Sequence, residues 1–174
     1  MPKVLIMSDS HGLEQEVQVI KARHKDADAM IHCGDSELAY GSETLNGFYY
    51  AKGNCDFEPD MENEQVLTVG DVTFYVTHGH LHQVKTTLMP LKYKAQENEA
   101  QVACFGHSHI AGAEVVDGVL LINPGSARLP RDREEPTYAL LEWDDPAEAT
   151  LQFYHVNGEK MDGLVLSTDL TAKN

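Results

Sequence analysis

The first third of the chain alternates short apolar runs with a longer amphipathic segment. Three apolar runs rich in branched residues predict buried strands: residues 3–8, 29–33 and 47–52. Between the first two runs, residues 13–24 place Leu13, Val17 and Ile20 at helical spacing, which predicts a helix. This strand–helix–strand order indicates βαβ units and a largely parallel sheet at the start of the chain.

The rest of the chain predicts pairs of strands joined by tight turns. The pairs cover residues 65–69 and 72–77, 113–116 and 119–122, and 137–143 and 149–156. A further strand is predicted over residues 102–105, and a helix over 81–99 in which Pro90 should cause a break or a kink. The tail from Thr168 is expected to be frayed.

These elements predict a single domain over residues 1–174, of α/β (α+β) class with two packed sheets. Hydrophobic residues make up 42% of the chain and charged residues 24%, a balance typical of globular proteins. No internal repeat, low-complexity tract or linker interrupts the pattern.

The strongly acidic charge excludes several classes of partner. Lys and Arg total 13 against 28 Asp and Glu, which gives a formal net charge of −15. Such a chain repels nucleic-acid phosphates and anionic lipid, so neither general nucleic-acid binding nor membrane binding is expected, although a local cationic site could hold a phosphate. No apolar run approaches the roughly 20 residues of a membrane helix. Three widely spaced cysteines indicate a reduced, cytoplasmic setting without a disulfide framework.

Polar side chains suited to metal binding cluster directly after the predicted strands. They are Asp9, His11, Asp35, Asn54, His78, His107 and His109. Ligands of open α/β sheets bind beyond the carboxyl ends of the strands, so these side chains are expected to meet. Mixed oxygen and imidazole ligands suit Mn²⁺, Fe²⁺ or Zn²⁺ rather than Ca²⁺. Seven ligands with one shared carboxylate would fill two four-ligand sets, as in two-metal sites with ions about 3.5–4 Å apart.

These residues occur in blocks that resemble the calcineurin-like metallophosphoesterases. The blocks of that family are DxH, GD, GNH[DE], H and GHxH, in this order. The chain has DSH from Asp9, GD from Gly34, GNCD from Gly53, a lone histidine at position 78, and GHSH from Gly106. The resemblance spans residues 3 to about 126. The small size and the NPGS block at Asn123 resemble the compact bacterial and archaeal phosphodiesterases of the family.

The resemblance implies a role for each candidate ligand. It assigns Asp9, His11 and His109 to a first divalent ion and Asn54, His78 and His107 to a second, with Asp35 as the bridge between them. It also implies a two-sheet β-sandwich flanked by helices in four layers. Mn²⁺ is the expected activating ion, with Fe, Zn or Ni as alternatives.

The chain departs from the family at one position. Many members have a histidine after the block's asparagine, as a general acid or a group that stabilises the transition state, whereas this chain has Cys55. A thiol donates hydrogen bonds poorly, so protonation of poor leaving groups is in doubt. Asp56 keeps the acidic position of the block and either takes part in catalysis or orients its neighbours. His80, two residues from His78, is a candidate replacement acid.

Other residues keep two interpretations. Cys55 could act as a nucleophile, because nearby metals could lower its pKa or it could touch one, but a reactive cysteine also needs an oriented base. Arg128, Arg131 and Arg133 could clamp a phosphate, but the acidic residues among them favour a solvated loop. His32 is expected to be a core residue or a partner of a ligand rather than a ligand itself.

Two functions from different classes follow. The first is a dinuclear-metal phosphoesterase, most consistent with a phosphodiesterase, in which a metal-bridging hydroxide attacks phosphorus in line. Its substrate would be a small phosphodiester. The alternative is a non-catalytic scaffold that resembles the retromer sorting subunit. The apolar segment 48–51 and the late strand pair could support a homo-oligomer.

Overall fold

The computed structural model describes residues 1–131 and 133–171. Its long helices are α1 (Gln15–Arg23) and α2 (Met89–Glu97), and its short 3-10 turns are η1 (Glu43–Leu45), η2 (His80–His82) and η3 (Pro146–Glu148). The strands of the first half are β1 (Lys3–Met7), β2 (Ala29–His32), β3 (Phe48–Tyr50), β4 (Glu64–Val69) and β5 (Val72–Thr77). Those of the second half are β6 (Val102–Cys104), β7 (Gly112–Val116), β8 (Val119–Asn123), β9 (Thr137–Glu142), β10 (Ala149–His155) and β11 (Lys160–Thr168).

The strands form two sheets, as the sequence predicts. One sheet has the order β11-β10-β9-β1-β2-β3, and the other has the order β4-β5-β6-β8-β7. β1, β2 and β3 pair in parallel, which confirms the βαβ start of the chain. The pairs β4–β5, β7–β8 and β9–β10 are antiparallel, as their turns predict.

Three apolar clusters hold the sheets and helices together. The alternation along β1 separates two of them: Val4 and Ile6 enter the cluster between the sheets, and Leu5 and Met7 enter the cluster beneath α1. A strand buried on both faces must be apolar throughout, which explains its unbroken hydrophobic run. The third cluster packs α2, through Leu91, against the outer face of the other sheet.

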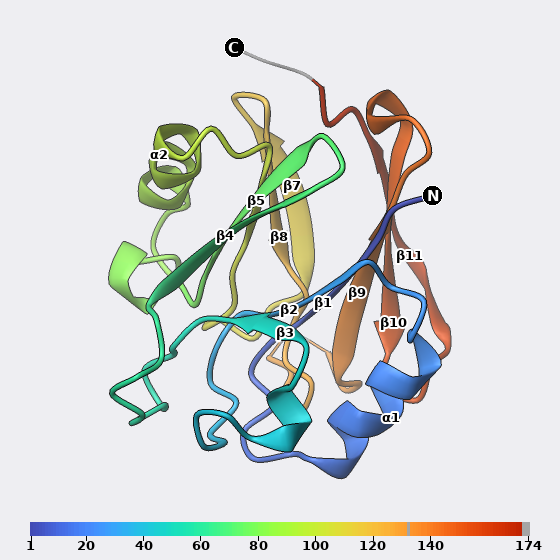
Figure 1. Ribbon diagram of the computed structural model, residues 1–174. Helices are drawn as coiled ribbons and strands as arrows, with labels where there is room; N and C mark the ends of the chain where they lie inside the picture. The colour runs from blue at the N-terminus through green and yellow to red at the C-terminus, as the bar shows by residue number, and fades with distance from the viewer. Residues whose placement is uncertain (132, 172–174) are drawn as a thin grey trace.

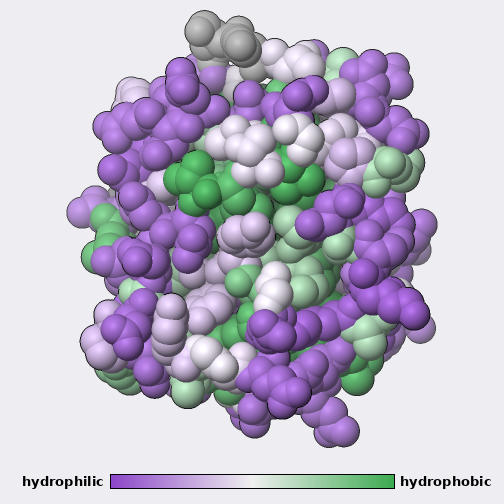
Figure 2. All heavy atoms as spheres, in the orientation of Figure 1, coloured by the Kyte–Doolittle hydropathy of each residue, from purple (hydrophilic) through white to green (hydrophobic). Residues whose placement is uncertain are grey.

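The order of layers is therefore helix, sheet, sheet, helix. Figure 1 shows α1 and α2 on opposite sides of the two sheets. In the same orientation, hydrophilic side chains dominate the outline of the molecule and apolar ones gather in the middle of this face (Figure 2). The four-layer sandwich expected from the family resemblance is confirmed. No helix among the described residues is long and apolar enough to span a membrane.

The helix predicted over residues 81–99 is wrong in its first half. A 3-10 turn and an irregular segment precede α2, which begins only at Met89. Pro90 lies in the first turn of α2, where its fixed φ suits the helix and its missing N–H has no intrahelical partner to lose. Pro90 therefore starts the helix and does not break or kink it.

The end of the chain is more ordered than the sequence predicts. β11 pairs with β10 as the edge of the first sheet, although the hydrophobic pattern does not predict this strand. Beyond it, Leu170 is 3% exposed, belongs to the cluster between the sheets, and donates its N–H to the Pro146 carbonyl at 2.7 Å. The expected fraying from Thr168 is wrong up to this residue, and residues 172–174 lie outside the described part.

Candidate metal centre

The candidate ligands lie where the loops of both sheets meet. Asp9 and His11 follow β1, and Asp35 follows β2. His78 follows β5, and His107 and His109 follow β6. Hydrogen bonds cross between the sheets at this point: His78 Nδ1 bonds to the Cys33 carbonyl at 2.8 Å, and the His107 N–H donates to Asp9 Oδ2 at 3.1 Å. The two sheets are thus joined through the site.

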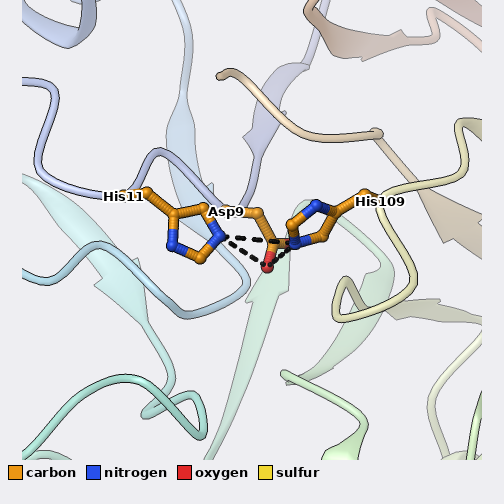
Figure 3. A group of neighbouring side chains, drawn as sticks. All are labelled: Asp9, His11 and His109. Atoms are coloured by element: carbon orange, nitrogen blue, oxygen red, sulfur yellow. Dashed lines mark hydrogen bonds and ion pairs between the residues drawn. The ribbon is translucent and has the colours of Figure 1, made fainter. Parts of the chain in front are cut away.

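Asp9, His11 and His109 form one compact group. Figure 3 shows the two imidazoles on either side of the Asp9 carboxylate and turned toward it. Asp9 Oδ1 lies 3.1 Å from His109 Nε2 and 3.8 Å from His11 Nε2, and the two Nε2 atoms are 3.3 Å apart. These distances match three ligand atoms that face one shared point.

Asp35 and His78 form a second group that touches the first. Asp35 Oδ2 lies 3.1 Å from His78 Nε2, and the same nitrogen lies 3.7 Å from Asp9 Oδ1. The His107 ring is adjacent to the His78 ring, with centroids 5.1 Å apart. Asp9, Asp35 and His78 are all nearly inaccessible to solvent.

Hydrogen bonds at Nδ1 orient three of the histidines. His11 Nδ1 bonds to Glu37 Oε2, His78 Nδ1 to the Cys33 carbonyl, and His109 Nδ1 to the Leu129 carbonyl, each at 2.8 Å. These partners are acceptors, so Nδ1 carries the proton and each neutral ring presents the Nε2 lone pair to the site. Metal-bound histidines are oriented in this way in proteins.

The site fits a divalent cation. Asp9 Oδ1 and His78 Nε2 are buried and complete no hydrogen bond with a described residue. The lone pairs of His11 and His109 face each other at 3.3 Å, which is repulsive unless positive charge lies between them. Buried polar atoms without partners are costly, and a metal ion that accepts their lone pairs would remove that cost.

The backbone at these residues is strained. Asp9, His11, Asp35, His107 and His109 all have positive φ, between 41° and 72°. Non-glycine residues adopt this left-handed region at a cost of about 1–3 kcal/mol each, and such residues cluster at functional sites. Five of the seven candidate ligands therefore have a conformation that fold stability alone does not favour.

Two glycines make room for the carboxylates. A Cβ on Gly53 would lie 2.1 Å from Asp35 Oδ1, and a Cβ on Gly106 would lie 2.4 Å from Asp9 Oδ2. No other residue fits at either position without moving a candidate ligand. The glycine in each of these two blocks thus has a steric reason.

The carboxylates favour positive charge at the site. Burial raises the pKa of the Asp35 carboxyl, but the adjacent His78 outweighs this effect and holds that pKa well below its usual range. The Asp9 carboxylate raises the pKa of His109 despite partial burial. Burial, together with the charges of His78 and Lys85, lowers the pKa of His107 to about 4, so this ring is neutral at pH 7. Neutral imidazole and ionised carboxylate are the forms that bind metal.

Asn54 and Cys55 are less clear candidates for metal binding than the aspartates and histidines of the two groups. Asn54 is exposed, and its side chain donates to Cys55 Sγ at 3.6 Å. Cys55 Sγ lies within 4.8 Å of ligand atoms of His11 and Asp35. Burial and the charge of Asp35 raise the pKa of the Cys55 thiol to about 11, which argues against a thiolate nucleophile.

Asp56 and His80 have distinct surroundings. The Asp56 carboxylate accepts three backbone N–H groups, those of Asp35, Gly53 and Glu37, each at 2.8 Å. It is therefore a positioning residue that fixes the loops carrying Asp35 and its neighbours. The His80 ring lies next to His78 and His107, with centroids 5.4 and 6.1 Å away, so His80 borders the site.

Several residues hold the ligands in place, a role that the sequence does not predict for them. Glu37 binds His11, and the Ser126 hydroxyl donates to the Asp9 carbonyl at 2.7 Å. Arg128 donates to the His11 carbonyl, so this arginine is tied to the ligand loop and is not merely solvated. Glu37 follows the GD block by two residues, and that proximity is the one sequence signal that could have pointed to it.

Comparison with known proteins finds a matching family and several relatives. The family model of the calcineurin-like phosphoesterase superfamily domain matches residues 2–146. A relative in Bacillus subtilis strain 168, the probable metallophosphoesterase YsnB, is 52% identical over 162 residues, which cover 92% of this chain and 95% of the relative. The phosphodiesterase MJ0936 of Methanocaldococcus jannaschii is 29% identical over 145 residues, 71% of this chain and 82% of that protein.

Solved structures show the same fold. The crystal structure of a predicted phosphoesterase from Streptococcus pneumoniae TIGR4 has a TM-score of 0.91 and 34% identity, and the match covers 95% of this chain and 96% of that one. Vps29 of Entamoeba histolytica complexed with Zn²⁺ has a TM-score of 0.73 and 21% identity, with the same coverage of both chains. At that identity, the likeness to Vps29 concerns the fold alone.

Proposed function

The chain belongs to the calcineurin-like phosphoesterase superfamily, and on this premise we propose that it is a metal-dependent hydrolase of small phosphodiesters. The observation that carries the proposal is the convergence of three Nε2 lone pairs, from His11, His78 and His109, on the buried Asp9 carboxylate. The phosphodiester preference is supported by the similarity to MJ0936, which is named a phosphodiesterase.

We assign two divalent ions to the site, with Mn²⁺ as the preferred ion. Asp9, His11 and His109 would hold the first ion. Asn54, His78 and His107 would hold the second, and Asp35 would bridge the two. When bound, two such ions supply an activated water and positive charge for the phosphate oxygens.

Other residues of the chain orient the proposed ligands, and few side chains near the site could donate a proton. Glu37 and the Leu129 carbonyl fix the rings of His11 and His109, and Asp56 fixes the backbone of Asp35. In the absence of a histidine at position 55, His80, which borders the site, is the proposed but weaker proton donor to the leaving group, because burial and the charge of His78 lower its pKa.

Removal and return of metal tests the proposal. We expect the stripped protein not to hydrolyse bis(p-nitrophenyl) phosphate, and added Mn²⁺ to restore turnover with close to two ions bound per chain, because ligands for two ions are present. Initial rates and metal analysis of the same samples measure both quantities. Turnover that persists in the stripped protein would overturn the metal-dependent mechanism.

Replacement of Cys55 by histidine tests the missing acid. We expect Cys55→His to raise turnover of a simple alkyl phosphodiester by about 100-fold, because a positioned general acid contributes most where the leaving group is poor. Hydrolysis of p-nitrophenyl esters should rise much less, since that leaving group needs no proton. Cys55→Ser, measured with the same two substrates, should show no gain. Equal changes for both substrates would contradict this role of position 55.

A scaffold function is the second candidate, supported by the likeness to the fold of Vps29. Retention of seven candidate ligand side chains favours the enzyme. Protein that binds two ions but hydrolyses no phosphoester would favour the scaffold. In either case we propose one metallophosphoesterase domain over residues 1–174, because one core cluster joins both sheets. We also propose a cytoplasmic location, because all three cysteines are unpaired.

A further inference from the structure

A cavity of about 480 Å³ lies beside the candidate metal centre, on the face of the second sheet that carries α2. Its wall is mostly apolar and includes Val84, Phe105, Ile110 and Leu121. Pockets that bind small organic ligands have this size and this kind of lining.

The cavity and the metal centre share a wall. Ser108 lines the cavity and stands in the chain between His107 and His109. Arg131, another lining residue, donates its N–H to the His109 carbonyl at 3.0 Å. The cavity therefore lies next to the segment of chain that carries His107 and His109.

Gly112 leaves part of the cavity open. It lies at the start of β7, an edge strand, and a Cβ built on it meets no atom within 4 Å. A glycine inside a strand forfeits side-chain packing, and it often marks a place where a ligand approaches the backbone closely. Nothing in the packing of the protein around Gly112 requires a glycine there.

The charge of the cavity contrasts with that of the chain. Lys85 and Arg131 line it together with one carboxylate, Glu114, which gives a local balance of +1 in a protein of net charge −15. The cavity thus joins an apolar wall to two cationic side chains, one of which belongs to Arg131, the residue bonded to the His109 backbone.

We propose that this cavity binds one substituent of the phosphoester, an aromatic ring group that bears a negative charge of its own, as in a nucleotide. This inference rests on the proposed function, because the phosphate at the metal centre places the substituent. The apolar wall would contact the ring, and Lys85 and Arg131 would face the second anionic group.

Binding of three graded ligands to the Mn²⁺-loaded protein tests this subsite. The ligands are methyl phosphate, thymidine 5′-monophosphate and thymidine 3′,5′-bisphosphate, with calorimetry as the measurement. We expect each to bind at least tenfold more tightly than the one before, because the second adds a ring and the third adds a charge. Gly112→Phe should remove the gain from the ring, because its side chain would fill the open space. Lys85→Ala and Arg131→Ala should remove most of the gain from the second phosphate.

Matched controls exclude general effects. Val115→Phe introduces the same side chain on the same strand at an exposed residue outside the cavity, and Lys25→Ala removes an exposed cation on the other side of the molecule. Both should keep all three affinities. Equal affinities for methyl phosphate and thymidine 5′-monophosphate, or a gain that survives Gly112→Phe, would overturn the subsite. Hydrolysis of bis(p-nitrophenyl) phosphate, measured in parallel, reports separately on the proposed function, since these equilibria need no turnover.

Discussion

Asp35→Asn is expected to lower metal-dependent hydrolysis of bis(p-nitrophenyl) phosphate by more than about 100-fold. Loss of a group that merely orients a ligand already costs about 10–100-fold, and Asp35 is the proposed bridge between both ions. Asparagine is the informative replacement because Asp35 has a φ of 58°, and asparagine tolerates the left-handed region that alanine disfavours. Its amide oxygen can still accept the Cys55 N–H, so the change removes charge and leaves the loop intact.

The measurements are initial rates with added Mn²⁺, together with the number of ions bound per chain. Asp71→Asn is the matched control, because Asp71 is exposed in the turn between β4 and β5, and it should keep the full rate. Circular dichroism should show both variants folded. If folded Asp35→Asn keeps half of the rate, Asp35 does not bridge the ions.

Strand positions could be predicted from sequence because burial imposes a simple pattern. β5 has the predicted bounds, and β1 differs by one residue, since both are apolar runs that end at a polar ligand. The same boundaries locate the site, because the loops that follow β1, β2, β5 and β6 all open at one end of the sandwich. Sequence order and strand ends were therefore enough to propose Asp9, His11 and Asp35 as neighbours.

β11 could not be predicted because its pattern is broken. Gly163 has a φ of 81°, and the pairing with β10 shifts register between Gln152 and Tyr154. A bulge of this kind interrupts the period-two alternation that identifies a strand. The alternating residues of β11 are also only partly buried, so their hydrophobic signal is weak.

The partners that orient the ligands are also hidden in the sequence. Glu37 reaches His11 across 26 positions, and the Leu129 carbonyl reaches His109 across 20. A backbone carbonyl has no side-chain signature, and a surface glutamate has no distinctive context. Only the packing of the loops reveals which tautomer each histidine adopts, and with it the direction of each Nε2 lone pair.

Asp56→Asn is expected to lower both stability and metal affinity. The Asp56 side chain is 4% exposed and both of its oxygens are used, Oδ2 by two backbone N–H groups and Oδ1 by a third. An amide must turn its NH2 toward at least one of these donors, which leaves a buried N–H without an acceptor. Loss of one hydrogen bond to a charged group costs about 1.5–3 kcal/mol, a shift in Tm of about 3–12 °C for a chain of this length.

Metal affinity separates positioning of the site from simple destabilisation. The N–H groups that Asp56 accepts belong to Asp35, to Gly53 beside the Asp35 carboxylate, and to Glu37, which orients His11. Their displacement should weaken Mn²⁺ binding at least about tenfold at a temperature where the variant is fully folded. Asp60→Asn, an exposed change in the same segment, should alter neither Tm nor affinity. A lower Tm with unchanged Mn²⁺ affinity would show that Asp56 supports the fold but does not set the geometry of the metal centre.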